Sequence, residues 1–430
     1  IIYRRQLMTL LQSVGVLLTF AAIVSFINHK FLRFPPAIGM VAVSTVFAML
    51  LLLFNGSFHG ALLSGIIPEI KKFDFHGFLL HGILAYLLFA GATKVDIAGL
   101  KKWAGPIGSL ASFGVVCSAF TTGTILWFVS GFLGFELPFI WACLFGALIS
   151  PTDPIAALGI VKSINAPKHL EKKLVGESLF NDGTGVVLFL TILAIIQGQD
   201  LSTVDVALML TRELVGAVLL GLLLGYVVYL ALKEVDHYPV VILLTFALAT
   251  GSYALAEAVH VSAPVCTVVC GLFIGHVIKE NLSAMTHNHV DQFWEFLDET
   301  LNACLFALMG LELLVLEFSW MNVLLGGVAF LATILGRFVG VAVPLAPFGR
   351  RISKGTIPVL TWGGLRGGIS LALALSLPPS ELSGLLATLA FITVILSTLG
   401  QGLTLKYVVQ HYHKPKVAAE PVSEVVAEKE

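Results

Sequence analysis

Long apolar blocks, separated by short polar or proline-bounded breaks, recur along the whole chain. A helix needs about 20 residues to cross the roughly 30 Å hydrocarbon core of a bilayer, and the blocks reach that length. Stretches such as Leu214–Leu232 are apolar on every face, whereas the strands of a membrane barrel would alternate in segments of about ten residues. The pattern therefore predicts an all-α polytopic membrane protein.

About thirteen transmembrane helices are predicted when the blocks are divided at charged or proline-bounded breaks. The stretch His287–Glu299 mixes acidic, histidine and aromatic residues, and we expect it to lie along the cytoplasmic interface. The eighth and ninth spans are separated only around Glu257–His260. The predicted spans begin near Leu7, Pro36, Gly77, Pro106, Pro138, Leu174, Val206, Pro239, Val261, Leu301, Met321, Ile357 and Leu382.

Lys and Arg are concentrated on one side of the predicted topology. The loops after odd-numbered spans and the tail hold eighteen of them, including Lys173, against five in the other loops and at the N-terminal end. Because cytoplasmic loops retain these residues, we expect the C-terminus in the cytoplasm and the N-terminus outside, although Arg4 and Arg5 argue mildly against the latter. Residues 1–411 would form a transmembrane domain and residues 412–430 a short disordered tail.

Composition excludes an ordinary soluble fold, since 57% of the residues are hydrophobic, 12% are charged and the mean hydropathy is +0.94. No basic tract indicates a nucleic-acid partner, and no cofactor is implied. The five cysteines lie in apolar stretches and are interpreted as packing residues. Cys266 and Cys270 share a helix face, but no further Cys or His completes a metal-ligand set.

Two predicted spans are interrupted by residues that fit a lipid-facing helix poorly. The fifth contains Ser-Pro-Thr-Asp-Pro at 150–154, and the twelfth contains Thr-Trp-Gly-Gly-Leu-Arg-Gly-Gly at 361–368. Each break frees backbone groups that need partners inside the bilayer. The two spans lie seven apart and therefore run in opposite directions, as in an inverted repeat whose equivalent triplets are spans four to six and eleven to thirteen. Such paired interruptions indicate a transporter's midplane site.

Ordinary Gly/Pro kinks are the alternative interpretation of these breaks, because membrane helices tolerate them. Kinks alone, however, do not require Asp153 and Arg366, which stand inside the two breaks. An ionisable group at that depth costs a few kcal/mol even on the mildest scale. The charges therefore favour a functional site.

Asp182 is the strongest candidate for a functional group, since it lies about two turns into the sixth span, too deep to cap the helix. Burial favours the neutral form of an unpaired carboxyl group, so Asp182 can hold a proton reversibly near neutral pH. A small dehydrated cation would be drawn to the carboxylates of Asp182 and Asp153, the hydroxyls of Ser178 and Thr152, and carbonyls freed by the break. A group that accepts a proton or a cation, but not both, couples their movements.

Structural roles remain open for each of these residues. Ser178 and Thr152 could satisfy backbone carbonyls, and Asp153 could cap the second half of the broken helix. For Asp182 a structural role would require a permanent Arg partner.

Helical spacing separates the polar residues of the sixth span into two faces. Glu177 and Asn181 are i,i+4 on one face, while Ser178 and Asp182 are i,i+4 on the neighbouring face. Arg337 of the eleventh span stays charged at depth, and pairing with Glu177 would leave Asp182 free to titrate. Arg366 would offset helix-end carbonyls at the second break in the absence of an ion.

Three motifs together resemble the NhaP/NHE-type cation:proton antiporters: Ser-Pro-Thr-Asp-Pro at 150–154, Gly-Glu-Ser-Leu-Phe-Asn-Asp-Gly at 176–183 and Gly-Leu-Arg-Gly-Gly at 364–368. The likeness extends from the Leu-Leu-Phe-Ala-Gly stretch at 87–91 onward. It implies an NhaA-like antiporter fold and a homodimer in which a six-helix core, spans four to six and eleven to thirteen, slides against a dimerisation panel formed by the remaining spans.

The resemblance also assigns roles to residues. It implies that Asp182 is the transport carboxylate, that Asp153, Thr152 and Ser178 line the ion site, and that Glu177, Asn181 and Arg337 form a polar network behind it. The electroneutral branch has Asn-Asp where the electrogenic branch has Asp-Asp, so Asn181-Asp182 implies one-for-one exchange of Na⁺, or Li⁺ or K⁺, for H⁺. Several relatives place an acid just after Leu-Leu-Phe, where this chain has Ala90-Gly91. The short tail favours a bacterial plasma-membrane protein.

Two other functions compete with exchange. An intramembrane aspartyl protease also needs two buried aspartates, but its Tyr-Asp and Gly-x-Gly-Asp motifs occur at neither Asp153 nor Asp182. A passive cation channel would conduct down a gradient without moving protons. We therefore expect a transporter rather than an enzyme, with monovalent cations, protons and membrane lipid as its partners.

Overall fold

The computed structural model describes residues 2–57, 77–163, 168–198, 203–314, 316, 319–353 and 355–412, and no β-strand occurs among them. The all-α prediction is therefore confirmed for the described residues, while the predicted tail lies outside them from residue 413 onward. The helices are α1 (Ile2–Ile27), η1 (Asn28–Leu32), α2 (Pro36–Ser57), η2 (Phe78–Ile83), α5 (Leu84–Thr93), α6 (Ile97–Lys102), α7 (Ala104–Ser109), η3 (Leu110–Gly114), α8 (Val115–Phe132), α9 (Phe139–Ile149), α10 (Pro154–Ser163), α11 (Lys168–Ile196), α12 (Thr203–Leu232), α13 (Tyr238–Ala258), α14 (Ala263–Asn281), α15 (Ala284–Leu311), η4 (Glu312–Leu314), α16 (Trp320–Leu345), η5 (Ala346–Arg351), α17 (Thr356–Trp362), α18 (Gly368–Leu375), α19 (Glu381–Leu396), η6 (Ser397–Gln401) and α20 (Gly402–Tyr412).

Nine helices of the described part are long and apolar enough to cross a membrane. The predicted count of thirteen adds α5, the charged helix α15 and the two interrupted spans, α9–α10 and α17–α18. Helices begin within six residues of the predicted starts, with one exception at the tenth span. A polytopic helical membrane fold is therefore established, and the count of thirteen stays a prediction.

The exception is α15, which begins at Ala284 and runs without interruption to Leu311, so the predicted start near Leu301 is wrong. The stretch His287–Glu299 forms the first half of this helix. Its Trp294 is only 1% exposed, donates its indole N–H to the hydroxyl of Thr245 in α13 at 3.1 Å, and packs against Phe89 of α5 with ring centroids 4.7 Å apart. Aromatic packing across three helices thus buries one face of this half of α15, whereas Phe296 on another face is 69% exposed, and the predicted position along the cytoplasmic interface stays a prediction.

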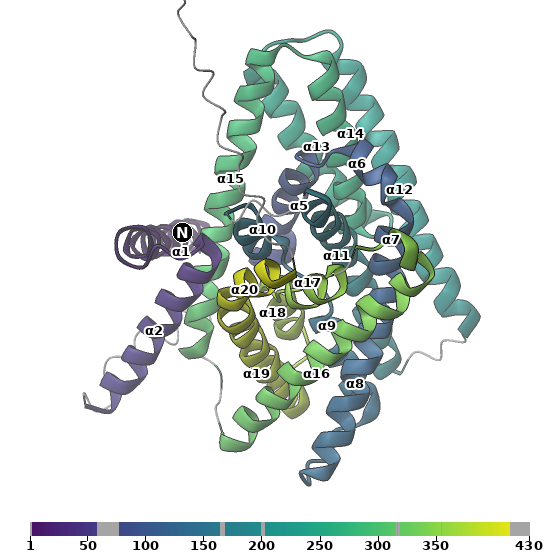
Figure 1. Cartoon of the computed structure of the whole chain (residues 1–430). Helices are drawn as coiled ribbons and strands as arrows, with labels where there is room; N and C mark the ends of the chain where they lie inside the picture. The colour runs from purple at the N-terminus through teal and green to yellow at the C-terminus, as the bar shows by residue number, and fades with distance from the viewer. Residues whose placement is uncertain are drawn as a thin grey trace, which may run out of the picture.

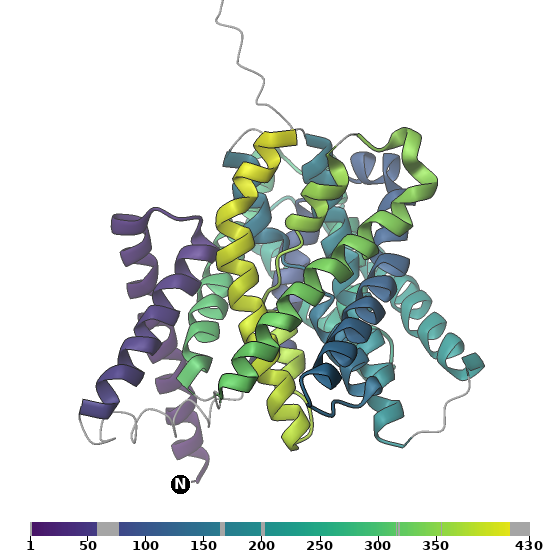
Figure 2. The same cartoon turned by 60° about the horizontal axis from the view of Figure 1, so that its bottom comes forward.

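The interrupted helices lie at the centre of the molecule, with α1 and α2 on one flank and α12 on the opposite flank (Figures 1 and 2). Buried apolar residues form two clusters. One combines α8–α11 and α16–α20 with α1, α2 and the second half of α15. The other combines α5, α12, α13 and α14 with the first half of α15, and it contains Cys266 and Cys270. The six predicted core spans thus share one cluster, which also includes α1 and α2.

Small residues let α8 approach α9 closely. A Cβ at Gly146 of α9 would collide with the backbone of Ala119 in α8, and one at Gly123 would meet the backbone of Cys143 at 2.8 Å. Helices in membranes associate through such close packing because lipid tails provide no hydrophobic drive between them. This contact fixes the first half of the broken span against its neighbour.

We expect Gly146→Ala to destabilise the protein by about 1–3 kcal/mol, because the added methyl group meets backbone that cannot rotate away. The apparent melting temperature of the purified protein in detergent should fall by several degrees. Gly131→Ala is the matched control, since a Cβ at Gly131 of α8 meets nothing within 4 Å. Equal melting temperatures for both variants would contradict the proposed close contact.

Candidate functional site

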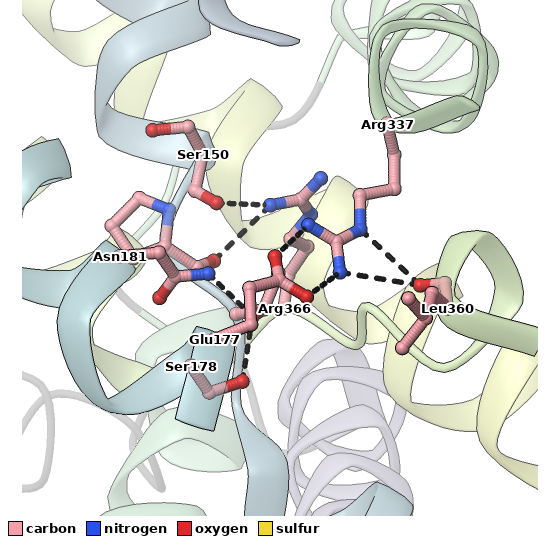
Figure 3. Close-up of polar contacts among 9 residues, drawn as sticks. Ser150, Glu177, Ser178, Asn181, Arg337, Leu360 and Arg366 are labelled. Carbon is pink, nitrogen blue, oxygen red and sulfur yellow. Dashed lines mark hydrogen bonds and ion pairs between the residues drawn. The ribbon is translucent and has the colours of Figure 1, made fainter. Parts of the chain in front are cut away.

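The two interrupted helices meet at their breaks, each of which satisfies backbone groups of the other. The backbone N–H of Asp153 donates to the carbonyl of Leu365 at 2.7 Å. In return, the Arg366 guanidinium donates through one nitrogen to the carbonyls of Ser150, at 2.6 Å, and Pro151, at 3.2 Å (Figure 3). Arg366 therefore lies beside carbonyls at the end of α9, in the first break, whereas the sequence interpretation placed its partner carbonyls at the second break.

Helix α11 contributes a second set of contacts to the first break. The hydroxyls of Thr152 and Ser178 are hydrogen-bonded at 2.9 Å, and the amide of Asn181 donates to the same Thr152 oxygen at 2.7 Å (Figure 3). All three side chains are buried, with at most 3% of each residue exposed. The Thr152 hydroxyl is thus held from two successive turns of α11.

Glu177 and Arg337 form a buried bidentate ion pair between α11 and α16 (Figure 3). Arg337 also donates to the carbonyl of Leu360 from two nitrogens, at 3.2 and 3.3 Å. The guanidinium fits because a Cβ at Gly364 would collide with it. The Glu177–Arg337 ion pair, predicted from charge and from depth in the membrane, is present, so each of the two charges is neutralised by the other.

Asp182 lies on the other face of α11 and does not contact Arg337. It is 6% exposed, and one of its carboxyl oxygens is fully buried with no hydrogen-bond partner among the described residues. Its side chain lines a cavity of about 1430 Å³, together with Thr152, Asp153 and Ser178. The four residues predicted to bind the cation therefore meet at one wall of a single cavity.

The cavity is lined by α5, α10, α11 and α15 and by the neighbouring ends of α1 and α2 with η1. Its lining also includes the exposed residues Lys94, Asp96 and Glu295. Lys94 pairs with Asp298 at 3.2 Å, and Asn302 donates to the same carboxylate at 2.8 Å. The cavity supplies a route by which small ions and water can reach Asp182.

Charged groups gather where the two interrupted helices cross. The carboxyl groups are those of Asp153, Glu177 and Asp182, and the guanidinium groups are those of Arg337 and Arg366. Burying an unpaired charge costs several kcal/mol, and one oxygen of Asp182 has no hydrogen-bond partner among the described residues. The carboxyl group of Asp182 is therefore suited to binding a positive charge reversibly.

The sequence interpretation misplaced Lys173, which was counted among loop lysines. It lies inside α11, is 0% exposed, and places its ammonium 4.0 Å from the ring centroid of Trp103. The assignment of Lys173 to a loop was wrong because an aromatic ring can stabilise a buried ammonium group, so a lysine need not lie in a solvent-exposed loop. A second omission is the polar group on η6, whose i,i+4 spacing resembles that of the sixth span. It consists of Ser397, Thr398 and Gln401.

Known proteins share both the sequence and the fold. The model of the family described as "Sodium/hydrogen exchanger, transmembrane" matches residues 16–411. The Na⁺/H⁺ antiporter NhaP of Pseudomonas aeruginosa is 43% identical over 404 residues, covering 92% of this chain and 95% of that protein. The Na⁺/H⁺ antiporter NhaH of Halobacillus aidingensis is 31% identical and covers 89% and 93%, respectively.

A solved structure extends the comparison to three dimensions. The sodium proton antiporter MjNhaP1 of Methanocaldococcus jannaschii, at pH 8, superposes with a TM-score of 0.77 at 20% identity, covering 94% of this chain and 99% of that chain. This likeness shows a common fold. From the family match and the 43% identical relative, the chain belongs to the sodium/hydrogen exchanger family, among its NhaP/NHE-type antiporters.

Proposed function

We propose that this protein is a secondary active antiporter that exchanges Na⁺, or Li⁺ or K⁺, for H⁺ with Asp182 as the shared carrier. The observation that carries the proposal is the contrast between two carboxylates on α11. Glu177 is bound bidentately by Arg337, whereas Asp182 lines the cavity with one oxygen unpartnered among the described residues. The names of the Pseudomonas and Halobacillus relatives support Na⁺ and H⁺ as the exchanged ions.

The cation would bind among oxygen atoms of Asp182, Asp153, Ser178 and Thr152, which line the same cavity. Oxygen ligands suit small hard cations, and two nearby carboxylates supply the charge that offsets dehydration. Asn181 supports the site by donating to the Thr152 hydroxyl, while Arg366 holds the carbonyls of Ser150 and Pro151. Protonation of Asp182 removes the charge that attracts the cation, so the two ions compete.

One-for-one exchange is part of the proposal because Asp182 is a single carrier group. One carboxylate is neutralised by one Na⁺ or one H⁺, and the neighbouring residue, Asn181, supplies an amide and no second carboxylate. The loaded carrier has the same net charge in both directions of the cycle, so the proposed turnover is electroneutral.

The alternating-access part of the proposal rests on the resemblance and on loop charge. The core, spans four to six and eleven to thirteen, would move as an elevator against a panel through which two chains dimerise in the bacterial plasma membrane. The exposed lining of the cavity includes Lys94, which belongs to a loop predicted to be cytoplasmic, and this supports an inward-facing state in the proposed cycle. In this orientation the C-terminus is cytoplasmic and the N-terminus external.

Asp182→Asn should abolish exchange, because an amide neither releases a proton nor supplies a negative charge. The measurement is Na⁺-induced dequenching of a pH dye in everted vesicles, with signal expected at the level of vesicles lacking the protein. Asp291→Asn makes the same chemical change at an exposed carboxylate of α15 and should keep wild-type activity. Cation-driven dequenching that persists in Asp182→Asn would show that another group carries the proton.

Membrane voltage should neither drive nor retard the exchange. An extra charge moved per cycle would couple to the potential by about 2.3 kcal/mol per 100 mV. Proteoliposomes with opposed K⁺ gradients and valinomycin set the potential, while ²²Na⁺ uptake is followed at fixed pH. Equal initial rates at both polarities are expected, and uptake that reverses its direction with the potential would exclude one-for-one stoichiometry.

The Glu177–Arg337 pair should act as a structural clamp. Glu177→Gln leaves a buried guanidinium without its counter-charge and should cost about 3–5 kcal/mol of stability. The double variant Glu177→Gln/Arg337→Met should lose less than the sum of the two single losses, because it leaves neither charge unpaired. Melting temperatures in detergent measure all three variants, and strictly additive losses would argue against the pair.

A further inference from the structure

The backbone of the second break is held by the last membrane-spanning helix run, α19–η6–α20. The N–H of Arg366 donates to the Ser397 hydroxyl at 3.1 Å, and the Thr398 hydroxyl donates to the carbonyl of Arg366 at 3.3 Å. Ser397 and Thr398 are 0% and 1% exposed. Two adjacent residues thus satisfy both backbone groups of the one arginine that stands inside the break.

Gln401 extends these contacts along the break. Its side-chain carbonyl accepts from the Ser397 hydroxyl at 2.6 Å, and its amide lies 3.5 Å from the carbonyl of Trp362, the last residue of α17. The three side chains belong to η6, a π-helical turn between α19 and α20. The extra residue of a π-helical turn changes which side chains face a neighbouring helix.

A comparable contact occurs at the first break. There Ser178 and Asn181 of α11, the third helix of the first predicted triplet, hold the side-chain hydroxyl of Thr152 beside α10. At the second break, Ser397 and Thr398 of the corresponding helix in the second triplet hold the backbone of Arg366. Each broken helix is therefore hydrogen-bonded at its break by side chains of the helix that follows it.

We propose that Ser397, Thr398 and Gln401 are positioning residues for cation exchange, which set the affinity of the site through Arg366. The inference rests on the proposed function. Arg366 connects the two breaks, since its backbone is bound by η6 and its guanidinium by the carbonyls next to Thr152 and Asp153. A shift of its backbone displaces the guanidinium and with it the carbonyls and ligands of the first break.

The test compares Ser397→Ala and Thr398→Val with wild type for the half-saturating Na⁺ concentration and the maximal rate per folded molecule, in everted vesicles at fixed pH. Loss of one buried hydrogen bond should raise the half-saturating concentration by roughly three- to tenfold. The maximal rate should change less than twofold. Thr398→Ser keeps the hydroxyl and should restore the wild-type value, whereas Thr398→Val has nearly the same shape without it.

Thr404→Val is the matched control, because Thr404 of α20 also contacts the broken helix but only by accepting from the Trp362 indole at 2.9 Å. Its half-saturating concentration should equal that of wild type. An unchanged half-saturating Na⁺ concentration in Ser397→Ala and Thr398→Val would overturn the inference. So would variants whose only change is a smaller amount of folded protein. Absence of Na⁺-dependent exchange in wild type would instead refute the proposed function.

Discussion

An unpaired backbone group costs several kcal/mol at membrane depth, and each interrupted helix exposes such groups where lipid offers no partner. Here each break provides hydrogen-bond partners for the other. The backbone N–H of Asp153 donates to the carbonyl of Leu365, and the Arg366 guanidinium donates to the carbonyls of Ser150 and Pro151. This exchange requires the helices to cross at their breaks, which places the residues of each break beside those of the other. Thr152 and Asp153 are consequently held at one place on the wall of the cavity.

The crossing also explains why two carboxylates on the same helix have different chemistry. Glu177 faces α16, where Arg337 binds both of its oxygens, and Asp182 faces the cavity five residues later. Arg337 is in turn held by Leu360 at the end of α17, so the clamp depends on the second break. A guanidinium group keeps its proton in proteins, so the proposed proton carrier is a carboxyl group, and Asp182 is the one that faces the cavity without a bound arginine.

Much of the site could be predicted because its residues are of types that rarely occur inside apolar membrane helices. Proline and glycine inside apolar spans located both breaks, and i,i+4 spacing separated Glu177 from Asp182. The contacts of η6 could not be predicted, because Ser and Thr in membrane helices ordinarily bond to a carbonyl one turn earlier, as Thr404 does with Gly400 at 2.6 Å. Only the fold shows that Ser397 and Thr398 reach another helix. Likewise, Lys173 was predicted to lie in a solvent-exposed loop, because its aromatic partner, Trp103, is far away in sequence.

Asn181 links the hydrogen-bond geometry of the site to the number of charges it can carry. Its amide donates to the Thr152 hydroxyl, which leaves that hydroxyl's own proton for another acceptor. A carboxylate at the same position could only accept, so the Thr152 hydroxyl would have to turn and donate to it. It would also place a further carboxylate next to Asp182, and with it a second group able to take up a proton or a cation. An amide at residue 181 thus maintains the orientation of the ligand and, in the proposed exchange, leaves Asp182 as the single carrier.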